Sequence, residues 1–170
     1  SGRSGPLVFV KVRHEIHGAG EHEPVLTEFH DIVYRGPARP GDVTPPPVAA
    51  PAHATWEKHW VPDEVMLFRY SALTFNGHRI HYDRSYATGV EAYPGLVVHG
   101  PMVATLLLDL LRQHLPEADL ESIAFRAVRP LFDTHPFHVC VSAQADGKHF
   151  ELWAKDHEGW LSMDATAQIR

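Results

Sequence analysis

One ten-residue stretch of the sequence, TFNGHRIHYD, gathers the polar side chains whose types and spacing could do chemistry. It holds an asparagine, two histidines, an arginine, a tyrosine and an aspartate: Asn76, His78, Arg79, His81, Tyr82 and Asp83. Histidine exchanges a proton near neutral pH, and the guanidinium of arginine can bind a carboxylate through two parallel hydrogen bonds. We therefore interpret this stretch as a reaction centre and not as an ordinary solvated loop.

A second motif, VVHGPM, follows about twenty residues later. Pro101 fits the first position of a helix, and Gly100 before it has no Cβ. The N–H of Gly100 can therefore face an oxyanion at a helix N-terminus, where the helix dipole favours negative charge. One such donor typically lowers a reaction barrier by roughly 3 kcal/mol.

Two predicted helices place these motifs. The first, PDEVMLFRYSALT, opens with Pro62, Asp63 and Glu64, which suit a helix N-terminus, and it leads into the polar stretch. The second, VATLLLDLLRQHL, has apolar residues at helical spacing: Val103, Leu106, Leu107, Leu110 and Leu111. Because this second helix is apolar over most of its girth, we expect it to lie inside the protein.

The remaining pattern is that of strands. TWEKHWV indicates one strand before the first helix, and four runs after the second helix alternate with period two. Their apolar residues are Ile123, Phe125 and Ala127; Phe137, Val139, Val141 and Ala143; Phe150, Leu152 and Ala154; and Leu161, Met163, Ala165, Ala167 and Ile169. The pattern predicts an α+β protein in which an antiparallel sheet with one buried face wraps around a helix.

The N-terminal part of the chain has a different organisation. Residues 6–17 and 25–35 predict two strands of a hairpin. The Pro-dense sequence that follows favours an extended linker. We therefore expect three parts: strands in residues 1–36, a linker in 37–54 and a globular domain in 55–170.

The composition excludes several classes of partner. The 21 acidic side chains outnumber the 15 basic ones, for a net charge of −6, so we expect neither nucleic acid nor a membrane surface as a partner. The longest apolar run, MVATLLLDLL, is too short to span a bilayer. Because the single cysteine, Cys140, cannot form an internal disulfide, and no leader is apparent, the prediction is a soluble cytoplasmic protein.

The polar stretch and the later turn together resemble the MaoC-like hydratases and dehydratases of the hotdog fold. In that family a Gly-Asp-x-Asn-Pro-x-His loop precedes a Val-His-Gly turn into the central helix. Aligned without gaps, Phe75 replaces the glycine and Asn76 replaces the catalytic aspartate. His78 then stands for the asparagine and Arg79 for the proline, while His81 keeps the histidine.

The stretch RYSALTFNGHRIHYDRSYATGVEAYPGLVVHGPM is most similar to one subgroup, the itaconyl-CoA and mesaconyl-C4-CoA hydratases and the hydroxyacyl-thioester dehydratases of type 2. The resemblance implies a hydro-lyase for an α,β-unsaturated or 3-hydroxyacyl thioester, with a short branched dicarboxylic acyl-CoA as the expected substrate. CoA is then the handle of the substrate, and no cofactor or metal is implied. Residues 1–36 would be the closing strands of an incomplete N-terminal hotdog unit, and we expect a homo-oligomer or a pseudo-dimer of hotdog units.

Three residues are expected to do the chemistry. Hydration requires a base for water, a proton for Cα and stabilisation of the enolate, and we assign the base to His81 and the enolate to Gly100. Because an asparagine cannot take a proton, Asn76 is expected to orient the water or the imidazole. The predicted substrate-binding residues are Arg79, His78, Tyr82, Asp83 and His99, with Arg79 facing a substrate carboxylate and His99 orienting the turn.

Several alternatives stay open. Either His81 removes and returns the proton alone, or Tyr82 or Asp83 supplies a second group. His78 and His81 could be only a hydrogen-bonded loop pair, and Arg79 could be only a surface ion pair. The function could also be that of a fatty-acid-type 3-hydroxyacyl-ACP or -CoA dehydratase, a thioesterase-like relative or a catalytically silent thioester-binding module, because one fold hosts several chemistries.

Overall fold

The computed structural model describes residues 7–36 and 45–170, which fall into two units that divide after Pro45. The first unit holds β1 (Leu7–Ile16) and β2 (Leu26–Arg35), which pair antiparallel from Leu7 opposite Arg35 to Ile16 opposite Leu26. The predicted hairpin is thereby confirmed. The part of the predicted linker from 37 to 44 lies outside the described residues.

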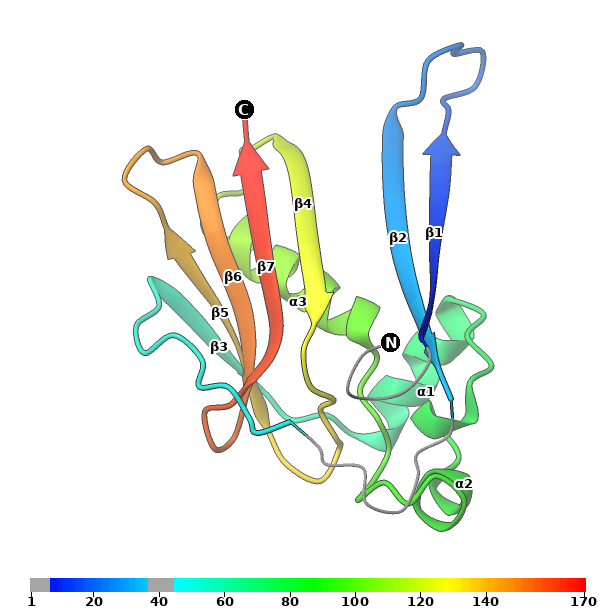
Figure 1. Ribbon diagram of the computed structural model, residues 1–170. Helices are drawn as coiled ribbons and strands as arrows, with labels where there is room; N and C mark the ends of the chain where they lie inside the picture. The colour runs from blue at the N-terminus through cyan, green and yellow to red at the C-terminus, as the bar shows by residue number, and fades with distance from the viewer. Residues whose placement is uncertain (1–6, 37–44) are drawn as a thin grey trace. The chain divides into compact units, whose positions relative to one another are not determined.

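The second unit is built on a five-stranded antiparallel sheet and one long helix (Figure 1). In chain order its elements are β3 (Trp56–Trp60), α1 (Glu64–Leu73), the 3-10 turn η1 (Arg79–His81), α2 (Arg84–Gly89), α3 (Gly100–His114), β4 (Leu120–Ala127), β5 (Phe137–Ala143), β6 (His149–Asp156) and β7 (Leu161–Ile169). The sheet order is β3-β5-β6-β7-β4, so β3 and β4 form its edges. This arrangement confirms the predicted α+β class.

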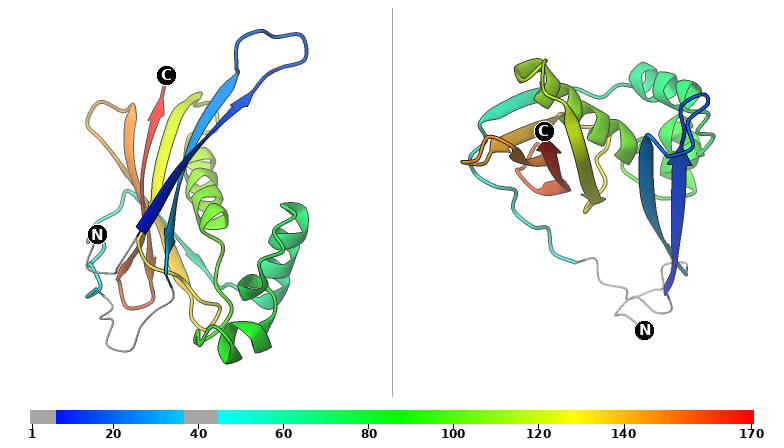
Figure 2. Two further views of the ribbon diagram at one scale, coloured as in Figure 1. Left: turned by 45° about the vertical axis from the view of Figure 1, so that its right-hand side comes forward. Right: turned by 90° about the horizontal axis from the view of Figure 1, so that it is seen from above.

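The sheet curves around α3 (Figure 2). The helix buries one broad face, formed by Met102, Val103, Ala104, Leu106, Leu107, Leu110 and Leu111. It packs chiefly on β5, whose inward residues Phe137, Val139 and Val141 are completely buried. Full burial of one such side chain contributes roughly 2 kcal/mol. The predicted buried helix is therefore confirmed, and among the described residues no helix has the length and apolarity needed to span a bilayer.

The strand β4 differs from its prediction. Its alternating residues were expected to face the core, but Phe125 is 47% exposed and Ile123 is only half-buried. The reason is that β4 is an edge strand beyond β7, whereas α3 packs mainly on the central strands. Alternation along β4 therefore marks one face of the strand without showing that this face is covered.

The residues just before β3 belong to the fold of the second unit. Ala49 bridges Trp160, the N–H of Ala50 donates to the carbonyl of Gly159 at 3.0 Å, and Leu161 donates to Val48 at 2.8 Å. The described end of the predicted linker is thus bonded to the turn between β6 and β7.

The segment of residues 96–98, which leads into α3, is tied to its neighbours on two sides. Three backbone hydrogen bonds hold it: Val97 N to Ile80 O at 3.0 Å, Val98 N to Leu131 O at 2.8 Å, and Asp133 N to Leu96 O at 3.0 Å. It therefore connects the turn η1 with residues 131–133, which precede β5. The start of α3 is fixed by regular backbone bonding and not by a free loop.

Candidate active site

His81 stands at the end of η1 and is 8% exposed. Its Nδ1 lies 2.7 Å from the carbonyl oxygen of Val97. Because a carbonyl can only accept a hydrogen bond, Nδ1 carries the proton and Nε2 presents the lone pair of the neutral ring. No described residue makes a hydrogen bond to Nε2, so this nitrogen is available as a base.

His99 lies directly against His81. The two rings stack with centroids 3.8 Å apart and planes 16° apart, and His99 is completely buried. Its Nε2 is 2.8 Å from the hydroxyl oxygen of Ser71 on α1. His78 approaches His81 edge-on, with ring centroids 5.6 Å apart. Three histidines predicted to belong to the site are therefore brought together.

Burial sets the protonation of the two stacked rings. It lowers the pKa of His81 below its usual 6.5, and the carbonyl of Val97 only partly opposes this effect. Burial, together with the neighbouring His81, likewise lowers the pKa of His99 to about 4. Both rings are therefore neutral at neutral pH, as a base in the position of His81 requires.

Asn76 shapes the loop before the histidines. Its side-chain oxygen accepts a hydrogen bond from the N–H of His78 at 3.0 Å, and its own N–H donates to the carbonyl of Ser71 at 2.9 Å. Phe75 before it has a φ of +54°, a left-handed conformation that favours glycine. The aligned family motif has glycine at that position. The role of Asn76 in orienting water stays a prediction.

Arg79 and Asp83 are bonded to each other. Nε and Nη2 of Arg79 both donate to one carboxylate oxygen of Asp83, at 3.0 and 2.7 Å, and the guanidinium lies 4.2 Å from the ring centre of Tyr86. The other oxygen of Asp83 caps α2 through the N–H of Tyr86. The hydrogen bond from the N–H of Tyr86 has the largest effect in lowering the pKa of Asp83, and the bonds from Arg79 lower it further. This contact between Arg79 and Asp83 is the surface ion pair that was the alternative role for Arg79. Binding of a substrate carboxylate by Arg79 stays a prediction.

Tyr82 also has an internal partner, because its hydroxyl donates to the carbonyl of Gly77 at 2.9 Å. That bond closes the loop on itself. Tyr82 and Asp83 are therefore both engaged, whereas Nε2 of His81 has no hydrogen-bond partner among the described residues.

Gly100 is the first residue of α3 and follows His99 directly. Pro101 therefore takes the second helical position, one residue later than expected. A Cβ built on Gly100 would meet only the flexible end of Met163, at 3.9 Å. The protein itself thus leaves room for a methyl group here, so any need for glycine would come from a bound substrate.

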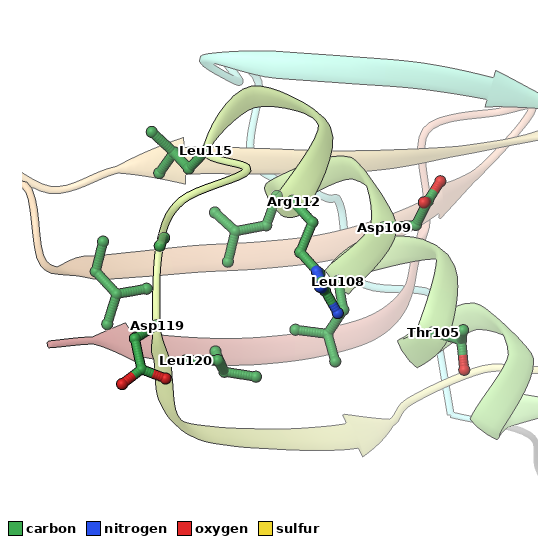
Figure 3. Close-up of a pocket in the computed structure, with 10 residues that line it drawn as sticks. Thr105, Leu108, Asp109, Arg112, Leu115, Asp119 and Leu120 are labelled. Carbon is green, nitrogen blue, oxygen red and sulfur yellow. The ribbon is translucent and has the colours of Figure 1, made fainter.

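Of two hollows on the surface of the second unit, one adjoins these residues. The larger, 550 Å³, lies between α3 and the start of β4, and Arg112, Asp109 and Leu120 are among its lining residues (Figure 3). No predicted site residue lines it. The smaller, 280 Å³, is lined by Phe68, Ser71, Ala72, Phe75, Asn76, Gly77 and Tyr82. Two predicted site residues, Asn76 and Tyr82, therefore line the smaller hollow.

Sequence reasoning missed Ser71 and Val97. Ser71 and Leu67 are the buried residues of α1, four positions apart on one face. A serine at a core position of a helix is the signal that could have found it, because a buried hydroxyl needs a partner. Val97 acts through its backbone carbonyl, which leaves no mark in the residue type. Within residues 7–36 and 45–170, no three histidine, cysteine or acidic side chains are arranged to hold a metal ion.

Comparison with solved structures identifies the fold. The (R)-hydratase from A. caviae matches 69% of this chain and 96% of its own length, with 19% identity and a TM-score of 0.59. The full-length peroxisomal multifunctional enzyme type 2 from Drosophila melanogaster matches 98% of this chain and 31% of its own, with 15% identity and a TM-score of 0.76. The antiparallel sheet around one long helix is therefore a hotdog fold.

The chain belongs to the hydroxyacyl-thioester dehydratase type 2 family, whose model matches residues 3–133. It is 45% identical over 170 residues to the mesaconyl-C(4)-CoA hydratase of Chloroflexus aurantiacus, covering 99% of this chain and 59% of that protein. It is 41% identical over 87 residues to the mitochondrial hydroxyacyl-thioester dehydratase type 2 of Schizosaccharomyces pombe, covering 49% of this chain and 29% of that protein. The chain thus spans less than two thirds of the length of these relatives.

Proposed function

We propose that this protein is a hydratase or dehydratase of an acyl-CoA thioester, interconverting the α,β-unsaturated and 3-hydroxyacyl forms. The observation that carries the proposal is the geometry of His81. The Val97 carbonyl fixes the proton on Nδ1, so Nε2 of a neutral ring can act as a base. The site lies at the N-terminus of α3, where negative charge is favoured.

In the hydration direction, Nε2 of His81 takes a proton from water while the water oxygen bonds to Cβ. The π electrons move to Cα and onto the thioester oxygen, and the N–H of Gly100 stabilises the resulting enolate. The imidazolium of His81 then returns its proton to Cα, so that one water molecule is added in all. Asn76 assists by orienting the water, because its amide can donate and accept hydrogen bonds but cannot take a proton.

For the substrate we propose a short branched dicarboxylic acyl-CoA such as mesaconyl-CoA or itaconyl-CoA. The support is the 45% identity to a protein named mesaconyl-C(4)-CoA hydratase. Arg79 would bind the distal carboxylate, and to do so it must exchange or share Asp83, since two of its donors are bonded there. Arg79→Lys should then weaken the preference for dicarboxylic over simple enoyl-CoA substrates. An unchanged preference would show that Arg79 serves only in the ion pair that stabilises the loop.

We further propose that residues 1–36 are the closing strands of an N-terminal hotdog unit. One face of the hairpin is largely apolar, with Val8, Val10, Val12, Ile32 and Tyr34 in register, and an isolated hairpin is marginally stable in water. A second hotdog unit in the same protein, or a second copy of it, would supply the missing cover. The expected location of the enzyme is the cytoplasm.

The test follows the absorbance of the enoyl-thioester bond with mesaconyl-CoA, itaconyl-CoA and crotonyl-CoA, together with a thiol reagent. Loss of absorbance without free thiol is the expected result, and it should disappear in His81→Ala. The control is His114→Ala, because His114 stacks on Trp56 at the other end of α3. Release of thiol would show a thioesterase instead, and no change with any substrate would favour a silent binding module.

A further inference from the structure

A polar pair is buried behind the candidate base. His99 is 0% exposed and Ser71 is 6% exposed, and both lie among the apolar residues of the core. Their side chains are bonded to each other at 2.8 Å. A pair of apolar side chains of the same shape would avoid the desolvation cost of these polar groups. The packing of the core therefore does not explain why they are there.

The hydrogen bonds of His99 show that its site suits a neutral ring. Nδ1 has no partner among the described residues, while Nε2 faces the hydroxyl of Ser71. If Nε2 carries the proton, it donates to Ser71 and only a lone pair is left unpaired at Nδ1. A protonated ring would have two N–H groups and only one acceptor, so the surroundings penalise it.

We propose that His99 is a positioning residue for His81 and that Ser71 fixes His99. This inference rests on the proposed function of His81 as the base. The aromatic face of His99 holds the ring of His81 at 3.8 Å, while the carbonyl of Val97 holds its edge. Two restraints, one on the face and one on the edge, define the direction of the lone pair on Nε2.

Neutrality of His99 also matters for the chemistry. When His81 carries the proton during turnover, a neutral aromatic face beside it is favourable, whereas a second cation at that distance would oppose the transfer. The titratable groups that face the stack are His78 from the loop, 5.6 Å from His81, and Tyr70 from α1, 4.8 Å from His99. Neither is a carboxylate, so within residues 7–36 and 45–170 no anion in contact with the stack offsets a second positive charge.

The experiment compares two double variants that differ only in the ring. Both remove the hydroxyl with Ser71→Ala; one adds His99→Phe, which keeps an aromatic face, and the other adds His99→Leu, which does not. Because both polar partners are replaced together, neither variant leaves a buried group unpaired. The single variant Ser71→Ala tests whether a loosened His99 matters. Ser162→Ala is its control, since Ser162 is a buried serine whose hydroxyl has no partner among the described residues.

In kinetics, Ser71→Ala should lower kcat roughly tenfold with KM little changed. Ser71→Ala/His99→Phe should restore most of that loss, and Ser71→Ala/His99→Leu should lose roughly a hundredfold, the scale set by small misplacements of a reacting group. Thermal midpoints should be similar in the two double variants. Equal activity of the two would show that the ring of His99 has no positioning role.

An NMR titration with labelled histidine separates this inference from the proposed function. It reads the tautomer of His81 and its pKa directly, without any substrate. We expect the Nδ1–H tautomer and a lowered pKa in the wild type and the phenylalanine variant, with mixed tautomers in the leucine variant. The same His81 spectrum in all variants would overturn the positioning role, whereas a wild-type enzyme without hydratase activity would overturn only the proposed function.

Discussion

Replacing Asp133 by alanine should lower the free energy of unfolding of the second unit by about 3 kcal/mol. The side chain of Asp133 is only 3% exposed. One of its oxygens accepts from the N–H of Leu96 at 2.8 Å, and the other accepts from Arg84 at 2.5 Å. Leu96 precedes Val97, whose carbonyl holds His81, so this carboxylate supports the backbone of the site.

The two bonds contribute unequally. Leu96 is 1% exposed, so loss of its acceptor leaves a buried N–H unpaired, at a cost of roughly 1–3 kcal/mol. Arg84 is 45% exposed and keeps Glu64 as a partner, so loss of its second ion pair costs about 1 kcal/mol or less. Asp133→Asn keeps an oxygen for Leu96 and removes the charge, and it should cost about 1 kcal/mol.

Urea denaturation followed by tryptophan fluorescence measures both variants. All 4 tryptophans, Trp56, Trp60, Trp153 and Trp160, lie in the second unit, so the signal reports its unfolding. The alanine variant should be the less stable of the two by about 2 kcal/mol. If both variants lose the same amount, the cost comes from the charge, and the hydrogen bond to Leu96 does not have the weight assigned to it.

Three further predictions concern the site itself. Gly100→Ala should lower kcat roughly a hundredfold at an unchanged thermal midpoint, because the added Cβ meets only Met163 at 3.9 Å; full activity would remove Gly100 from the oxyanion role. Asn76→Asp places a carboxylate in the loop of His81 and should raise the pKa of that ring. The acid limb of the profile of kcat/KM against pH should therefore move to higher pH. An unchanged acid limb would show that the side chain at position 76 does not influence the base. The pKa of His99 is about 4 in the fold, below its ordinary 6.5, so the unfolded state binds the proton first as pH falls. The contribution of His99 to stability is then complete above the ordinary pKa and is lost between about pH 6.5 and 4 with a slope of up to about 1.4 kcal/mol per pH unit. Urea titrations of wild type and His99→Phe over that range should show a flatter pH dependence in the variant, and identical curves would contradict this account.

Elements with strong local signals could be predicted from the sequence. The N-terminus of α1 has Asp63, whose carboxylate accepts from the N–H of Met66 at 2.7 Å, as expected for an N-cap. Apolar residues at helical spacing predicted the long helix, and alternating apolar residues predicted the strands that pack on it. These features depend on residues close in sequence, so they can be predicted without knowledge of the fold.

Features that depend on distant residues could not be predicted in the same way. Ser71 and His99 are 28 positions apart, and only the fold shows that they are bonded. The short helix α2 has no apolar periodicity long enough to detect. Its N-cap, Asp83, was therefore interpreted from the sequence as a residue of the site and not as a helix cap. Exposure of β4 depended on its place at the edge of the sheet, which alternation within the strand does not encode.

The position of the candidate base depends on backbone bonding more than on its own loop. The segment of residues 96–98 bonds to Ile80 on one side and to Leu131 and Asp133 on the other, and the carbonyl of Val97 within it holds His81. Because regular backbone bonds fix that carbonyl, the direction of the lone pair on His81 is set by the same structure that begins α3. A catalytic histidine in an exposed loop would have to be ordered by the substrate, at an entropic cost. Here the protein bears that cost on folding, so we expect little movement of His81 when a thioester binds.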